Sequence, residues 1–266
     1  MILYRAWILL SLLRASVSSL KATIMRRRVL LTVDPVKREF NVEGGPTDIG
    51  DKEAQLLTGL RDWLGRGRAA TALDGEMIDW ISDGDDGSAV ICSVPRTLAV
   101  TLSLRHRGIG VMLLTPDGRE VLVHKRAETK RVFPSMLDQW VGGVCGVGER
   151  ELDTLRREVS EETGIAIGLE GGPETTVYLG QTDVQTAFNN CLVHAYAVRL
   201  DAAQVSSMAF RDGEISWGRF MPLEELRALL ASKRADEFVP DGMQVWNWAE
   251  AEGKLAAVFA DTEDQR

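Results

Sequence analysis

Three glutamates are grouped in the segment Gly143–Ile165, whose sequence is GVCGVGERELDTLRREVSEETGI. Residues Glu149–Thr163 follow a helical pattern. Because Glu158, Glu161 and Glu162 are spaced i, i+3 and i+4, a helix places all three carboxylates on one face. Like charges at this spacing repel one another, unless divalent cations such as Mg²⁺ neutralise them. On the carboxylates alone, a solvated acidic helix face is the alternative.

The full spacing of this segment separates the two interpretations. Gly143 is followed after five residues by Glu149, and after seven more by Arg157–Ile165, which reads REVSEETGI. This spacing matches the Nudix box at every specified position, so the chain resembles the Nudix hydrolase superfamily between about Arg105 and Asp241. The resemblance implies an α/β/α sandwich with a mixed sheet.

The resemblance also implies roles for residues in and around the box. Glu161 and Glu162 correspond to the principal metal ligands, with the carbonyl oxygen of Gly142 beside them. Glu158 corresponds to the residue that binds a metal or deprotonates the attacking water. The implied cofactor is Mg²⁺, with Mn²⁺ as an alternative. The positions with structural roles, including an ion pair that orients the helix, are Gly143, Glu149, Arg157 and Gly164.

A further acidic ligand is implied by the resemblance in a later loop, six residues before an aromatic residue that leads into the sequence PLEEL. In this chain that position is Glu214, with Phe220 as the aromatic residue and Pro222–Leu226 after it. Asp212 and Asp183 are alternatives for the same role.

The sequence upstream of the box resembles one branch of the superfamily. Leu104–Gly108, Arg126–Trp140 and Asp236–Asp241 are similar to isopentenyl-diphosphate isomerases and to uncharacterised bacterial Nudix proteins near them. In the isomerases, the positions that match Arg126 and Lys130 contact the substrate diphosphate, a task that suits guanidinium and ammonium donors. The alternative for this basic pair is a solvated hairpin end.

One cysteine tests the isomerase interpretation. Cys145 falls near the catalytic cysteine of the isomerases, and His106 stands where one of their metal ligands could lie. However, the isomerase histidine two residues after the cysteine is Val147 here, and this chain keeps the complete glutamate series of the hydrolases. Hydrolysis is therefore predicted. Cys145 is then predicted to be a small loop residue, and His106 and His124 to be structural or surface residues.

The charge of the chain excludes some classes of protein. The 266 residues carry a formal net charge of −8, whereas nucleic-acid-binding proteins usually present a basic face. An acidic protein still binds a diphosphate when a metal cation lies between the two. Cys92, Cys145 and Cys191 are too few for a disulfide framework and form no CxxC pair. We expect a cytoplasmic protein that binds a small diphosphate substrate and no nucleic acid.

The N-terminal segment has an unusual composition. Residues 1–33 contain no Asp or Glu but several Arg and Lys, and the apolar run Ala6–Leu13 is shorter than the roughly 20 residues that span a bilayer. We interpret residues 1–28 as an extension, with Met25 as an alternative start. A targeting peptide for an organelle and a helix on a membrane surface are the other interpretations. Stable membrane insertion is not predicted.

Three further regions follow this extension. Residues 29–103 predict a small α+β appendage with a strand at Val29–Val33, a helix at Asp51–Leu64 and a strand at Ala89–Val94. Residues 104–255 form the predicted Nudix domain, and residues 256–266 an acidic tail.

Within the predicted Nudix domain, Val111–Thr115 and Val121–His124 predict a β-hairpin. In the box helix, Leu152, Leu155 and Val159 are predicted to pack inward. Trp140–Val144 is another short apolar run. The other predicted elements are strands at Thr175–Leu179, Cys191–Val198 and Ile215–Met221, and helices at Leu223–Ala231 and Asp241–Ala251.

The sequence therefore predicts Mg²⁺-dependent hydrolysis of a diphosphate bond, in a nucleoside-diphosphate-linked or other small organic substrate. The alternatives are an enzyme like isopentenyl-diphosphate isomerase and a non-catalytic Nudix module that senses a nucleotide-like ligand. The intact glutamate set argues against the sensing module. No motif reads a base, a sugar or a prenyl chain, so neither the organic group of the substrate nor the oligomeric state is predicted.

Overall fold

The computed structural model describes residues 8–10, 20–24, 29–34, 39–43, 76–81, 90–96, 99–100, 103–168, 175–186 and 189–259. The chain divides into two compact units. Unit 1 consists of Met1–His106 with Ala187–Asn190, and unit 2 of Arg107–Thr186 with Cys191–Arg266.

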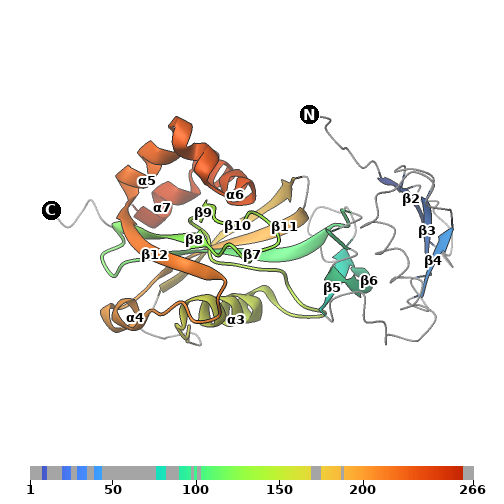
Figure 1. The fold of residues 1–266 in the computed structure, drawn as a ribbon, viewed down its shortest axis with the longest axis horizontal. Helices are drawn as coiled ribbons and strands as arrows, with labels where there is room; N and C mark the ends of the chain where they lie inside the picture. The colour runs from blue at the N-terminus through green and yellow to red at the C-terminus, as the bar shows by residue number, and fades with distance from the viewer. Residues whose placement is uncertain are drawn as a thin grey trace. The chain divides into compact units, whose positions relative to one another are not determined.

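In the part of unit 1 that the structure describes, the strands form two antiparallel sheets (Figure 1). The first has the order β1-β2-β3-β4, with bounds Ile8–Leu10, Leu20–Ile24, Val29–Asp34 and Glu39–Glu43. The second pairs β5 (Met77–Ile81) with β6 (Val90–Pro95). The strands predicted near residues 29–33 and 89–94 are confirmed. β1 and β2 lie where the sequence predicts no strand, and the predicted helix Asp51–Leu64 lies outside the described residues.

Unit 2 is built on a six-stranded sheet with the order β10-β11-β7-β8-β12, in which β9 also pairs with β8. β8 runs antiparallel to β7, β9 and β12. The strands β7 to β12 are His106–Leu114, Glu120–Arg126, Leu137–Asp138, Thr175–Gln185, Asn190–Arg199 and Ile215–Pro222.

Helices cover both faces of this sheet, which gives three layers (Figure 1). α3 and α4 lie on one face, and α5, α6 and α7 on the other. The helices α3 to α7 are Glu151–Thr163, Ala202–Ser207, Leu223–Leu230, Pro240–Ala251 and Lys254–Phe259, and a short 3₁₀ helix, η1, is Lys233–Glu237.

The hydrophobic core lies in two clusters, one on each side of the sheet. Successive strand residues point to opposite faces, so Met112 joins the cluster under α5 and α6, while Val111 joins the cluster under α3. Leu155 and Val159 are the residues of α3 that pack into the second cluster. Burial on both faces explains why the central strands are almost continuously apolar.

Several predicted elements are confirmed. The hairpin of β7 and β8 closes through a turn in which Thr115 Oγ1 donates to Asp117 Oδ1 at 2.7 Å and Gly118 has φ +69°. β10, β11, β12, α5 and α6 occur where strands and helices are predicted, within a few residues at their ends. The short elements β9, α4, η1 and α7 are not predicted by the sequence.

Two predictions about local structure are wrong. α3 begins at Glu151 instead of Glu149, because the Glu149 carboxylate accepts a hydrogen bond from Gly146 N–H and belongs to the preceding loop. Leu152 is 43% exposed, since it lies in the first turn, at the end of the helix. The apolar run 140–144 forms two isolated bridges, Val111↔Val141 and Gly108↔Val144.

The predicted boundary between the Nudix domain and an acidic tail falls inside α7. Val258 and Phe259 are buried in the core cluster under α5 and α6, so the folded domain continues past residue 255.

Candidate active site

The helix α3 carries the predicted site residues. It ends at Gly164, which has φ +70° and donates its N–H to Ser160 O at 3.0 Å, as predicted for a C-terminal glycine. The three glutamates differ in burial: Glu162 is 5% exposed, the Glu158 side chain is 12% exposed, and that of Glu161 is 56% exposed.

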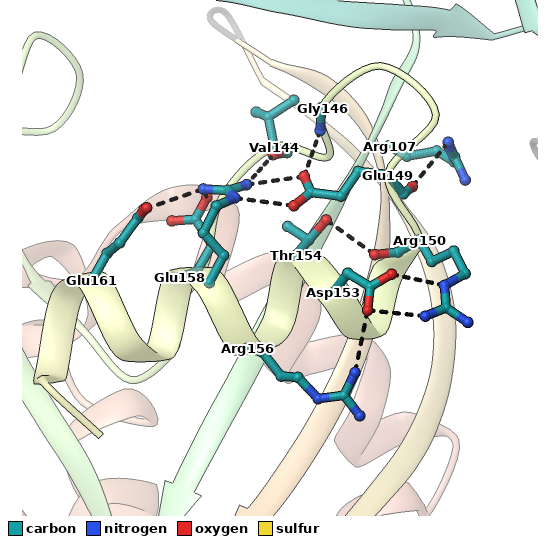
Figure 2. Close-up of polar contacts among 11 residues, drawn as sticks. Arg107, Val144, Gly146, Glu149, Arg150, Asp153, Thr154, Arg156, Glu158 and Glu161 are labelled. Atoms are coloured by element: carbon teal, nitrogen blue, oxygen red, sulfur yellow. Dashed lines mark hydrogen bonds and ion pairs between the residues drawn. The ribbon is translucent and has the colours of Figure 1, made fainter. Parts of the chain in front are cut away.

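The guanidinium of Arg157 joins the box loop to the helix, and its partners Val144, Glu149, Glu158 and Glu161 are labelled in Figure 2. Its Nε and Nη2 donate to the two carboxylate oxygens of Glu149 at 3.0 and 3.1 Å, and Nη2 also donates to Val144 O at 3.2 Å. Its Nη1 donates to Glu158 at 2.7 Å and to Glu161 at 3.2 Å. The hydrogen bonds that Arg157 donates to Glu149 raise the pKa of its guanidinium above the ordinary value. The predicted Arg157–Glu149 ion pair is therefore present.

Two glycines allow the box loop to approach its neighbours closely. A Cβ on Gly142 would lie 2.2 Å from the backbone oxygen of Ile109. A Cβ on Gly143 would lie 2.1 Å from a carboxylate oxygen of Glu158. Because real Cβ atoms do not approach other atoms this closely, a side chain at Gly142 would press on the Ile109 backbone, whereas one at Gly143 would displace the flexible end of Glu158.

Glu162 lies in a field of negative charge. Burial raises its pKa well above the ordinary value, and the charges of Glu158, Glu214 and Asp212 raise it further, while only Lys130 among the main contributors lowers it. The structure thus brings residues of α3 together with the loop before β12, as the sequence predicts for Glu214. The alternative Asp183 is instead an exposed residue of β10.

Lys130 and Glu214 form an ion pair between their ammonium and carboxylate groups. The backbones of the two loops are also joined, because Ala127 N–H donates to Glu214 O at 2.8 Å. Asp212 Oδ1 accepts the Glu214 N–H at 2.9 Å. The sequence does not predict the Lys130–Glu214 contact, since the two residues are 84 positions apart.

The carboxylates of Glu158, Glu161, Glu162 and Glu214, called here the carboxylate cluster, fit a divalent cation by charge and by ligand type. Among the described residues, no three Asp, Glu, His or Cys side chains are already placed to hold a metal ion. Arg157 lies between Glu158 and Glu161, and Lys130 lies on Glu214. Nevertheless, a buried carboxylate surrounded by others lacks compensating charge, and carboxylate oxygens are the ligands that Mg²⁺ prefers.

Cys145 and the two predicted structural histidines are buried. Burial raises the pKa of the Cys145 thiol to about 11, so the thiol is protonated near neutral pH. His106 Nδ1 is 2.8 Å from Leu104 O, and burial lowers the pKa of this histidine. Burial lowers the pKa of His124 to about 3. None of the three resembles an exposed nucleophile or acid.

The sequence interpretation missed a buried polar group beside the N-terminus of α6. Trp140 Nε1 and Gln139 Nε2 both donate to Gly242 O, at 3.0 and 3.2 Å. Asp138 Oδ1 accepts the Trp140 N–H at 3.0 Å, and burial raises the pKa of Asp138 to about 7. Two polar residues inside the apolar stretch MLDQWV were the available signal.

A second missed group lies near the start of α3. Arg107 Nη1 donates to Glu151 Oε1 at 2.7 Å, and His194 Nε2 lies 3.8 Å from the same oxygen. The Tyr178 hydroxyl hydrogen-bonds His194 Nδ1 at 3.2 Å. These residues come from four elements, and no local pattern in the sequence connects them.

Comparison with known proteins identifies the class to which this fold and site belong. The NUDIX domain family matches residues 104–242. An uncharacterised Nudix hydrolase of Streptomyces coelicolor is 33% identical over 171 residues, 64% of this chain and 86% of the relative. The uncharacterised Nudix hydrolase YfcD of Escherichia coli K12 is 29% identical over 187 residues, 69% of this chain and 94% of the relative. The crystal structure of DR0079 from Deinococcus radiodurans has a TM-score of 0.47 and 26% identity, covering 59% of this chain and 90% of that chain.

The chain belongs to the Nudix family, and the six-stranded sheet with helices on both faces confirms the predicted α/β/α sandwich. It is a hydrolase that acts on diphosphate bonds. No helix in the described part of the chain is long and apolar enough to cross a membrane.

Proposed function

We propose that this protein is a Mg²⁺-dependent hydrolase that cleaves the diphosphate bond of a nucleoside-diphosphate-linked or other small organic substrate. The proposal is supported by the arrangement of carboxylates around α3: Glu158, Glu161 and Glu162 share this helix, Glu162 is buried, and Glu158, Glu214 and Asp212 lie near enough to raise its pKa further. A bound cation would offset this unfavourable charge. Mn²⁺ is the alternative metal, and a cytoplasmic location stays a prediction.

The residues proposed to hold the metal are those of the carboxylate cluster and its neighbouring carbonyl: Glu158, Glu161, Glu162, Glu214 and Gly142. A divalent cation there supplies positive charge for the phosphate oxygens and acidifies the attacking water. Glu158, which accepts a hydrogen bond from Arg157 and lies against Gly143, is proposed to accept a proton from that water. Arg157 and Glu149 hold the loop and the helix in register.

Lys130 is proposed to contact the phosphate group that is distal to the metal. Its ammonium already lies on a carboxylate of the cluster, with the side chain 22% exposed, so an anionic substrate at this position would meet it. The sequence suggests the same contact for Arg126, whose Nε and Nη2 donate to Phe133 O and Val132 O at 3.2 and 3.0 Å.

Lys130→Ala is expected to raise KM more than it lowers kcat. A phosphate contact made in both ground and transition states is uniform binding, and its loss costs about 1–3 kcal/mol. Steady-state kinetics of the variant on an active diphosphate substrate measures the two constants separately. Lys125→Ala serves as the matched control, because Lys125 is a nearby lysine on β8. Unchanged KM and kcat in Lys130→Ala would remove Lys130 from the site.

The runner-up is isomerisation of isopentenyl diphosphate, suggested only by the similarity of Arg126–Trp140 to the isomerases. The buried, protonated Cys145 does not favour it. Cys145→Ala is expected to leave diphosphate hydrolysis within about twofold of wild type, because activated water replaces a thiol nucleophile. The test compares kcat and melting temperature, since removing a buried sulfur costs about 1 kcal/mol of stability. Abolished hydrolysis in a folded variant would reverse this ranking.

The proposed function is tested with a panel of nucleoside-diphosphate sugars, dinucleotides, nucleoside triphosphates and isopentenyl diphosphate, each with Mg²⁺ and with EDTA. Phosphorus NMR identifies the products. Cleavage of an anhydride to two phosphorylated products, only with Mg²⁺, supports the proposal. Conversion of isopentenyl to dimethylallyl diphosphate without phosphate release supports the isomerase.

A further inference from the structure

The loop 127–136 connects β8 to β9, and the side chain of Arg126, the residue before it, holds this loop. Arg126 is the last residue of β8, and its N–H donates to Met136 O at 2.9 Å. Its guanidinium donates to two consecutive carbonyl oxygens on the same loop, Nε to Phe133 O at 3.2 Å and Nη2 to Val132 O at 3.0 Å. The planar guanidinium has the forked geometry that two neighbouring acceptors require.

The backbone of this loop adopts a conformation that its residues do not favour. Phe133 has φ +50° and Ser135 has φ +60°, and neither is glycine. They flank Pro134, and a residue before proline is further restricted by the proline ring. Such conformations persist only where surrounding contacts impose them, and the contacts that Arg126 makes fall at Val132 and Phe133, where the strained stretch begins.

The loop presents Lys130 to the carboxylate cluster. Lys130 N–H donates to Ala127 O at 3.2 Å in a turn, and its ammonium lies on Glu214 and lowers the pKa of Glu162. The position of this ammonium therefore depends on the path of the loop between Ala127 and Met136.

We propose that Arg126 is a positioning residue that acts on the substrate diphosphate through Lys130, by holding residues 127–136 in one strained conformation. This inference rests on the proposed function for its kinetic part. It differs from the role that similarity to the isomerases suggests, in which Arg126 contacts the diphosphate itself.

A double-mutant cycle separates the two roles, using Arg126→Ala, Lys130→Ala and the double variant on a diphosphate substrate from the panel. Arg126→Ala alone is expected to raise KM about tenfold, the loss expected for one charge-assisted contact. If Arg126 acts through Lys130, it should change KM less than about twofold in the Lys130→Ala background, because coupled residues are not additive. Equal effects of Arg126→Ala in both backgrounds indicate an independent diphosphate contact and overturn the proposal.

Trypsin provides a readout that needs no substrate. Native protein is digested and cleavage after Lys130 and Arg131 is followed by mass spectrometry. Release of the loop in Arg126→Ala should speed this cleavage at least about tenfold, because a loop that opens more often is cut more often. Arg126→Lys, which retains a donor but not the fork, should be intermediate in both cleavage rate and KM. Arg219→Ala, an exposed arginine of β12 paired with Glu225, is the matched control and should resemble wild type.

Melting temperatures of all variants show whether each is folded, and Arg126→Lys replaces Arg126→Ala in the cycle if the alanine variant is not. Unchanged trypsin cleavage in Arg126→Ala overturns the proposal whatever the kinetics show. If no diphosphate is hydrolysed, the proposed function fails, and the cleavage rates alone decide whether Arg126 holds the loop.

Discussion

Replacing Glu162 with glutamine is expected to lower kcat by at least about a hundredfold, because even residues that only support a metal ligand cost ten- to a hundredfold when lost. Glutamine has the shape of glutamate, so the folded protein should persist. Glu162 lies among Glu158, Glu214 and Asp212, which raise its pKa, and a neutral amide removes that repulsion. In EDTA, the melting temperature of the variant should therefore be no lower than that of wild type.

The same variant is expected to lose the response to metal. A cation that binds only the folded state stabilises it by mass action, so Mg²⁺ should raise the melting temperature of wild type and leave that of Glu162→Gln unchanged. Asp153→Asn, on the exposed side of the same helix and paired with Arg150, is the matched control and should behave as wild type. Near-normal turnover of Glu162→Gln in saturating Mg²⁺ would sink the assignment of this residue to the metal.

Alanine at two adjacent glycines is expected to give opposite defects. A Cβ on Gly143 would meet the carboxylate of Glu158, the far end of a flexible side chain, at 2.1 Å. Gly143→Ala should therefore displace Glu158 and lower kcat about a hundredfold, with a melting temperature close to wild type. A Cβ on Gly142 would meet the backbone oxygen of Ile109 at 2.2 Å, so Gly142→Ala should destabilise the fold by about 3 kcal/mol.

Denaturant unfolding and steady-state kinetics measure the two effects. Gly110→Ala is the control, because its Cβ would make only ordinary contacts, the nearest at 3.5 Å from Trp140. A stable and fully active Gly143→Ala variant would contradict the place given to Glu158.

The parts of the fold that the sequence predicts correctly depend on local spacing. The α3 carboxylates and the closing Gly164 follow from a helical period over one segment, whereas the Arg157–Glu149 ion pair is implied by the resemblance to the Nudix box. The prediction that Leu152 packs inward is wrong, because the helical period gives only the face of the helix. Burial near the end of a helix also depends on which element covers it. Likewise, the apolar run 140–144 pairs only through single bridges, and its backbone approaches Ile109 closely at Gly142.

Contacts between distant segments account for what the sequence leaves out of the site. Lys130 and Glu214 are each predicted as site residues, but for different tasks, and only the fold joins them in an ion pair. Arg126 is predicted from its charge, whereas its hydrogen bonds to Val132 and Phe133 depend on a loop conformation with positive φ. Asp138 lies against Gly242 of α6, and the only sign of its burial in the sequence is its place within the apolar stretch MLDQWV.

The central claim is that a divalent cation held by the α3 carboxylates drives hydrolysis of a diphosphate. The measurement that tests it most directly is the initial rate of anhydride cleavage as a function of Mg²⁺ concentration, for metal-stripped wild type and Glu162→Gln. We expect no cleavage by wild type in EDTA, saturable recovery as Mg²⁺ is added, and no recovery by the variant. Full activity of wild type in EDTA, or an identical Mg²⁺ response in Glu162→Gln, would contradict it.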